Sequence, residues 1–129
     1  MREGRRGGRI GRVGASVLIV DDHEDFRKSA ASLLGAEGFD VVGSVGDGIA
    51  ALAAVEHLEP EVVVLDIRLP DIDGFAVAET LAARPRAPVV VLVSSRDAST
   101  YAERLSTTTA RGFIAKSELS GAAVAALLR

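Results

Sequence analysis

Four short aliphatic runs of this 129-residue sequence each end in polar side chains that could carry chemistry. In chain order these side chains are Asp21 and Asp22, then Asp66, then Ser94 and Ser95, and finally Lys116. Carboxylates held close together repel one another, so they either take up protons or bind a cation. Their oxygens favour Mg²⁺, Ca²⁺ or Mn²⁺ over zinc. If the fold brings the four ends together, the sequence predicts a site for a hard divalent cation.

The aliphatic runs alternate with segments of helical periodicity, and this alternation predicts how the four ends are positioned. We expect strands at residues 16–20, 41–45, 62–65, 89–93 and 112–114. We expect helices at residues 23–36, 47–58, 73–83, around Tyr101 and Leu105, and 117–128. Such alternation gives a parallel sheet with helices on both faces, an α/β doubly wound fold of five strands. The carboxyl ends of these strands meet at one edge, which is where active crevices lie.

Helix faces and helix ends can be predicted in more detail at three places. The residues expected to face the core from the helix at 47–58 are Ile49, Leu52, Ala53 and Val55. Ser117 is expected to cap the last helix, because its hydroxyl can accept a backbone N–H. His23 follows the acidic pair and is expected to start a helix, with contact to the site as the alternative.

Length and composition exclude several classes of protein. The length fits one domain. The sequence contains no cysteine, which excludes disulfides, thiolate metal sites and a cysteine nucleophile. Its longest apolar runs are about five residues, whereas a membrane span needs about 20. No apolar segment of a signal peptide follows the N-terminus. We therefore expect a soluble, cytoplasmic protein.

Residues 1–14 differ in composition from the rest of the chain. They hold five arginines against one acid, whereas acidic residues outnumber basic ones in the remainder. A Gly- and Arg-rich segment without aromatics cannot bury enough apolar surface to become ordered. We therefore expect a disordered basic leader at 1–14 and one folded domain at 15–129. A solvated tail is favoured for the leader over an arm that contacts nucleic acid or an acidic partner.

The combined pattern resembles the receiver domain of two-component response regulators over residues 15–128. The matching pieces are VLIVDD, VVVLDIRLPDIDG, VVVLVSS and RGFIAK. The spacing is similar as well, with 44 residues from Asp22 to Asp66 and 22 from Ser94 to Lys116. This resemblance implies a (βα)5 flavodoxin-like fold with strand order 2-1-3-4-5.

The resemblance also implies how the acceptor site is used. Asp66 is then the phosphoacceptor, and Lys116 contacts the phosphoryl group. Asp21, Asp22 and Asp66 hold Mg²⁺ together with the backbone carbonyl of Arg68. A carboxylate can attack the phosphorus of a phosphohistidine and form an acyl phosphate. Attack by one anion on another needs charge neutralisation, which Mg²⁺ and the lysine supply.

Two further residues are expected to transmit the signal. The resemblance places Ser94 at the switch hydroxyl and Phe113 at the switch aromatic position. Ser94 can donate a hydrogen bond to a phosphoryl oxygen, which draws its loop inward and leaves space for Phe113 to move. The added charge then biases the face made of helix four, strand five and helix five. A slip of one residue would make Ser95 the switch hydroxyl, although the spacing to Lys116 favours Ser94.

The sequence departs from the family pattern at two points on this signalling face. Family members usually carry proline in a cis peptide bond after the lysine, whereas this chain has Ser117. Three threonines, residues 107–109, stand where a glycine usually ends helix four. Without glycine, and with three β-branched residues, that helix end should fray. Both departures concern the output of the switch rather than the acceptor chemistry.

The expected function is a phosphoacceptor signalling domain rather than an enzyme. Its partners would be a histidine kinase or phosphotransfer protein, and a downstream protein or a C-terminal output domain that this sequence lacks. A homodimer is possible, whereas membrane or direct nucleic-acid contact by the receiver is not expected. The main alternative is a non-phosphorylated pseudo-receiver that acts as a docking module. A haloacid-dehalogenase-type phosphatase is disfavoured because it would need a second aspartate where Arg68 stands. A nucleotide-binding domain is disfavoured because Asp21 and Asp22 would repel the phosphate of the nucleotide.

Overall fold

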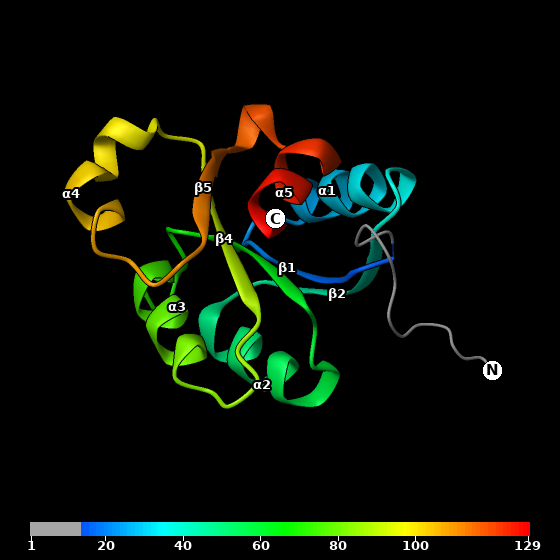
Figure 1. Cartoon of the computed structure of the whole chain (residues 1–129), viewed down its shortest axis with the longest axis horizontal. Coiled ribbons are helices and arrows are strands. Elements are labelled where there is room, and N and C mark those ends of the chain that lie inside the picture. Colours follow the sequence, from blue (N-terminus) through cyan, green and yellow to red (C-terminus); the bar gives the residue numbers. More distant parts are fainter. Residues whose placement is uncertain (1–13) are drawn as a thin grey trace.

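The computed structural model describes residues 14–129 and shows a parallel sheet with helices on both faces (Figure 1). The strands are β1 Ser16–Val20, β2 Asp40–Val45, β3 Val62–Asp66, β4 Val89–Ser94 and β5 Gly112–Ala115. The α-helices are α1 Glu24–Ala36, α2 Gly48–Leu58, α3 Gly74–Ala82, α4 Ala102–Leu105 and α5 Gly121–Leu128. The described residues also form the 3₁₀ helices η2 Ala98–Tyr101 and η3 Lys116–Glu118. The order β2-β1-β3-β4-β5 confirms the predicted fold. The proposed basic leader lies outside the described residues, except for Gly14.

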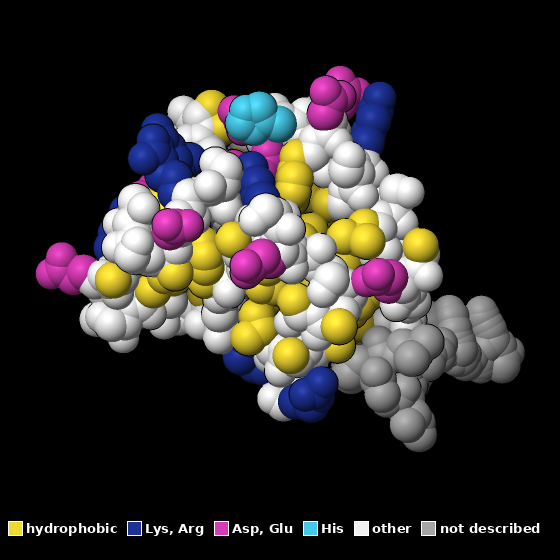
Figure 2. Space-filling model, turned by 90° about the horizontal axis from the view of Figure 1, so that it is seen from above, with side chains coloured by type: hydrophobic (Ala, Val, Ile, Leu, Met, Phe, Trp, Pro, Cys, Tyr) yellow, Lys and Arg dark blue, Asp and Glu magenta, His cyan; other side chains and the backbone are white. Residues whose placement is uncertain are grey.

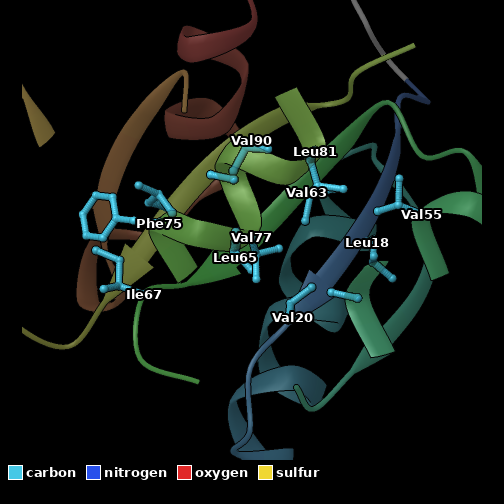
Figure 3. Close-up of a cluster of buried hydrophobic side chains, with 13 residues drawn as sticks. Leu18, Val20, Val55, Val63, Leu65, Ile67, Phe75, Val77, Leu81 and Val90 are labelled. Atoms are coloured by element: carbon cyan, nitrogen blue, oxygen red, sulfur yellow. The ribbon is translucent and has the colours of Figure 1, made fainter. Parts of the chain in front are cut away.

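The sheet separates two aliphatic cores because alternate strand residues point to opposite faces. Val63 and Leu65 of β3 pack with α2 and α3 in one cluster, which Figure 3 shows. Val62 and Val64 pack with α1 and α5 in the other. All five residues of β3 are buried, as expected for a central strand covered on both faces. No helix in the described part of the chain is long and apolar enough to cross a membrane.

Helix α2 buries only part of the face that the sequence predicted, because Val55 is buried and Leu52 packs against the core, but the other two residues are exposed. Its buried residues include Ala51 and Val55, whereas Ile49 is 65% exposed and Ala53 is exposed as well. Alanines recur throughout this helix, so its apolar pattern does not favour one face strongly. Its first turn is held by Asp71, whose carboxylate accepts the backbone N–H groups of Gly48 and Ile49. This contact from a distant loop orients the helix.

The prediction that Ser117 caps the last helix is wrong. Ser117 lies in η3, and α5 begins at Gly121 with Ser120 as its N-cap. The Ser120 hydroxyl accepts the Ala123 N–H at 3.0 Å, and the Glu37 carboxylate accepts the Gly121 N–H. This second contact comes from the end of α1, which the local sequence around Ser117 does not reveal. The peptide bond before Ser117 is trans, as are all others among the described residues.

The segment after β4 forms only short helical turns. Helix α4 ends at Leu105, before the three threonines, and neither η2 nor α4 contains a buried residue. This short helix agrees with the expected effect of β-branched residues on helix formation. Tyr101 and Leu105 are partly buried and pack against the core cluster of α2 and α3. The segment at 98–105 is therefore held at the edge of the core.

Gly74 begins α3 and lies against the strand end that carries Asp66. A Cβ atom here would lie 2.4 Å from the Asp66 carbonyl oxygen and 2.7 Å from the Ile67 Cα. Backbone atoms cannot turn aside as a flexible side chain can, so Gly74→Ala should destabilise the fold by about 1–3 kcal/mol. Gly35→Ala is the control, because a Cβ in α1 at Gly35 meets nothing within 4 Å. Urea unfolding of both variants checks this, and equal stability would contradict it.

Candidate functional site

The carboxyl ends of β1, β3, β4 and β5 meet around one hollow of about 430 Å³ at the edge of the sheet. The predicted site residues that line it are Asp22, Asp66, Arg68, Ser94, Ser95 and Lys116. Asp21 lies behind them, with no exposed surface. Acidic and basic side chains stand beside a histidine at one rim of the face in Figure 2, and hydrophobic side chains cover its middle. The fold thus brings together the polar strand ends that the sequence singled out.

Lys116 connects the two buried carboxylates of the site. Its Nζ lies 2.5 Å from Asp21 Oδ2 and 3.5 Å from Asp66 Oδ2. The short contact to Asp21 is an ion pair, but its geometry does not make a hydrogen bond, so Asp21 Oδ2 has none among the described residues. The ammonium group also lies 4.6 Å from the centre of the Phe26 ring, in a cation–π contact. No pattern in the sequence predicts this contact from α1.

Asp66 is the carboxyl group most affected by its surroundings. Burial, and then the neighbouring charge of Asp21, raise the pKa of Asp66 to about 6. The Lys116 ammonium and the N–H of Arg68, which donates to Asp66 Oδ1 at 3.3 Å, lower this pKa in part. One lysine therefore does not fully compensate the two buried carboxylates. A bound cation would compensate the remaining charge.

The acidic residues fit a divalent cation. Ligand atoms of Asp21, Asp22, His23 and Asp66 all lie within 4.8 Å of one another. Two observations support the fit, namely that two buried carboxylates share a single lysine and that the pKa of Asp66 is raised. Carboxylate oxygens are the ligands that Mg²⁺ prefers. The predicted use of the Arg68 carbonyl stays a prediction, because only its N–H contact to Asp66 is defined.

His23 starts α1 as its N-cap residue, as predicted, and also contacts the acidic cluster. Its Nδ1 lies 3.1 Å from one oxygen of Asp21 and 3.1 Å from one oxygen of Asp22. The His23 N–H of the backbone donates to the same Asp21 oxygen at 2.8 Å. His23 therefore both starts the helix and contacts the site, so both expectations for it hold.

Ser94 and Ser95 occupy different environments at the end of β4. Ser94 is 1% exposed, and its Oγ accepts the Arg96 N–H at 3.0 Å. Ser95 is exposed. Phe113 is partly buried on β5 and packs against the core cluster of α2 and α3. The roles of Ser94 as the switch hydroxyl and of Phe113 as the switch aromatic stay predictions.

Tyr101 is a further residue at this site that the sequence did not indicate. The sequence predicts only that Tyr101 lies in a helix, whereas in the structure its phenolic oxygen lies 3.4 Å from Ser94 Oγ. Seven residues separate the two side chains. The contact depends on the turn between β4 and η2, which no local pattern predicts. The one available signal was that this chain contains a single tyrosine and that it follows the hydroxyl pair.

Comparisons with known proteins agree on one family. The family model described as the response regulator receiver domain matches residues 17–127. The chain is 42% identical over 123 residues to protein-glutamate methylesterase/protein-glutamine glutaminase 6 of Anaeromyxobacter dehalogenans, covering 95% of the chain and 33% of that protein. It is 28% identical over 112 residues to the DNA-binding transcriptional activator EvgA of Escherichia coli, covering 87% and 55%. The chain thus spans about a third to half of these relatives.

Solved structures give the same result for the fold. The signal receiver domain of the putative response regulator NarL from Mycobacterium tuberculosis has a TM-score of 0.79 and 29% identity, with 89% of this chain and 97% of that one covered. The chemotaxis response regulator CheY4 of Vibrio cholerae has a TM-score of 0.75 and 21% identity, covering 89% and 96%. At that identity the second match supports the fold alone.

Proposed function

The chain belongs to the response regulator receiver domain family of two-component systems, as its motifs indicated, and on this premise we propose that it is a phosphorylation-dependent switch. Asp66 would accept a phosphoryl group from the phosphohistidine of a histidine kinase or phosphotransfer protein. The observation that carries this proposal is the buried Asp66 carboxylate, which faces a hollow and lies 3.5 Å from the Lys116 ammonium that also contacts Asp21. This arrangement offers an oxygen nucleophile beside a fixed cation.

The transfer step follows from the positions of these groups. An oxygen of Asp66 attacks the phosphorus, a new O–P bond forms, and the N–P bond of the phosphohistidine breaks. Lys116 offsets the negative charge on the phosphoryl oxygens as they approach. A bound Mg²⁺ would supply further charge neutralisation in the same hollow, held by Asp21, Asp22 and Asp66. With a pKa of about 6 before the metal binds, Asp66 is mostly the reactive carboxylate at neutral pH.

The direct test is labelling with acetyl phosphate, a small phosphoryl donor that needs no kinase. The intact mass of the protein should increase by one phosphate per chain when Mg²⁺ is present and stay unchanged when a chelator removes the metal. The alternative is the pseudo-receiver that only docks to a partner. Absence of labelling with Mg²⁺ at any donor concentration would contradict the switch and favour this docking module.

Metal binding should depend on Asp22 and increase with a phosphoryl analogue. We expect weak Mg²⁺ binding alone and tighter binding with beryllofluoride, which adds ligands and negative charge. Asp22→Ala should weaken Mg²⁺ binding about tenfold or more, because it removes one of the carboxylates of the cluster. The control is Asp25→Ala, which removes an exposed acid of α1 outside that cluster. Calorimetric titration measures both, and equal affinities for the two variants would place the metal elsewhere.

The wider role of the protein is part of the same proposal. We propose that the chain does not act as an enzyme on an external substrate, and that it works in the cytoplasm. Its output would come from a downstream protein or an attached domain, since the relatives compared are longer than their receiver parts. Those relatives include a methylesterase and a transcriptional activator, which differ in their output. We propose that Ser94, rather than Ser95, is the switch hydroxyl, with Phe113 as its aromatic partner, and that the switch signals through the face made of α4, β5 and α5.

A further inference from the structure

The hydroxyl of Ser94 stands between the acceptor site and the segment that follows β4. Ser94 Oγ accepts the Arg96 N–H and lies 3.4 Å from the phenolic oxygen of Tyr101. A serine hydroxyl has one proton to donate and two lone pairs that accept. If the Arg96 N–H and the Tyr101 O–H use the two lone pairs, the Ser94 proton stays available for a phosphoryl oxygen. The three groups can therefore bond to Ser94 at the same time.

The segment that carries Tyr101 is held by few contacts. Its two helical turns, η2 and α4, contain no buried residue. The Tyr101 ring packs against Phe75 of α3, with ring centres 6.0 Å apart and planes at 57°. The Arg104 guanidinium lies 4.2 Å from the centre of the same Phe75 ring and 2.8 Å from Asp73. These contacts tie the segment to one place on α3.

There is also space into which this segment can move. A second hollow of about 430 Å³ lies beside Tyr101 and is shared with Thr100, Arg104 and Arg96. It adjoins the hollow of the acceptor site, because Arg68 and Arg96 line both. Closure of this space would let Tyr101 shift without disturbing the buried core.

We propose that Tyr101 is a positioning residue that couples phosphorylation of Asp66 to the segment at 98–105. The proposal rests on the proposed function. The phosphoryl group draws the Ser94 proton, and the more strongly polarised hydroxyl attracts the Tyr101 O–H. The distance of 3.4 Å between the two oxygens then shortens toward the usual value of about 2.7–2.8 Å. Because Tyr101 is part of η2, this movement carries the weakly held turns with it.

This coupling differs from the expected role of Phe113. Phe113 lies on β5, packs against the core cluster and has no polar group to bond with Ser94. Phe113 would move into the space that Ser94 leaves, whereas Tyr101 is connected to Ser94 by a hydrogen bond. The two responses can therefore be separated by removing a single oxygen atom.

The chain is well suited to a test, because Tyr101 is its only tyrosine and it contains no tryptophan. Incorporation of 3-fluorotyrosine gives one ¹⁹F resonance that reports on this site. Addition of Mg²⁺ and beryllofluoride should shift this resonance. The bound fluoride signal in the same spectrum measures how much of the protein carries the analogue, and the shift should increase with it. Ser94→Ala, compared at equal occupancy of the analogue, should lose the shift. Ser95→Ala is the matched control and should keep it.

A second variant tests the hydrogen bond without removing the ring. Tyr101→Phe keeps a ring to pack against Phe75 but removes the phenolic oxygen. In wild-type protein the analogue should slow amide hydrogen exchange in residues 98–105 severalfold, and in Tyr101→Phe this slowing should be lost. Bound analogue without a change in the tyrosine resonance, or a shift that persists in Ser94→Ala, would overturn the coupling alone. Absence of any bound fluoride signal would overturn the proposed function and the coupling with it.

Discussion

Asp66→Asn should abolish labelling by acetyl phosphate while the fold is retained. The amide has nearly the same shape as the carboxylate, but it is not a nucleophile that can form an acyl phosphate. The matched control is Asp97→Asn, which changes an exposed acid at the start of η2 that makes no capping hydrogen bond. Intact mass spectrometry should find one phosphate on this control and none on Asp66→Asn. A phosphate on Asp66→Asn would assign the acceptor to another residue.

The same substitution should stabilise the metal-free protein at neutral pH. The pKa of Asp66 is raised from 3.8 to about 6, first by burial and then by Asp21. Below the lower value the group is protonated in both the folded and the unfolded chain, so the folded state carries no penalty for a buried charge. Above the higher value it is ionised in both states, and the folded state carries the full penalty. Stability contributed by the neutral form is therefore lost as pH rises between about 4 and 6.

The size of this effect follows from the size of the shift. About two pKa units correspond to about 3 kcal/mol, an upper value for the gain on replacing Asp66 by a neutral side chain. Lys116 keeps Asp21 as a partner in the variant. Urea unfolding in a chelator should show the variant about 1–3 kcal/mol more stable at pH 7 and nearly equal to wild type at pH 4. Mg²⁺ should reduce the difference at pH 7. A wild-type protein more stable than Asp66→Asn at pH 7 without metal would contradict the charge balance described for the site.

The parts of the fold that could be predicted are those set by patterns within each element. The runs that became β3 and β4 are continuous in Val and Leu, because central parallel strands are covered on both faces. Polar residues at the ends of such strands must meet at one edge. The convergence of Asp21, Asp66 and Lys116 could therefore be predicted from their positions after the runs.

The parts that could not be predicted depend on contacts between distant segments. The start of α5 is set by Glu37 at the end of α1, and the orientation of α2 is set by Asp71 in the loop after β3. The local sequence around Ser117 or Ile49 does not predict either contact. Tyr101 was missed for the same reason, since its approach to Ser94 depends on how the turn after β4 folds back.

We predict a long lifetime for the phosphorylated form from two arginines that line the acceptor hollow. Arg68 and Arg96 both line this hollow, and both are exposed. They stand two residues after Asp66 and two after Ser94. In the receiver family, side chains at these positions flank the path of the water that hydrolyses the acyl phosphate. A guanidinium only donates hydrogen bonds, so it cannot accept a proton from that water.

An opposite effect of the arginines has to be weighed. A guanidinium can stabilise the transition state of phosphoryl transfer, as an arginine finger does. This effect should be the smaller one here, because Lys116, together with Mg²⁺ when it is bound, would already offset the charge of the phosphoryl group. The two arginine side chains are also bulky enough to screen the acyl phosphate from solvent. We therefore expect the arginines to slow hydrolysis.

Arg68→Asn combined with Arg96→Glu should shorten the lifetime of the phosphorylated protein about tenfold or more, because a carboxylate and an amide can orient the attacking water. The control combines Arg129→Asn with Arg86→Glu, which changes the net charge equally at exposed positions outside the hollow. Loss of phosphate from purified protein in Mg²⁺ buffer, followed by intact mass, gives the lifetime of each form. If the first double variant lost phosphate as slowly as wild type, while the control also matched wild type, the arginines would have no protective role. Faster loss in both double variants would trace the effect to net charge rather than to access of water at Asp66.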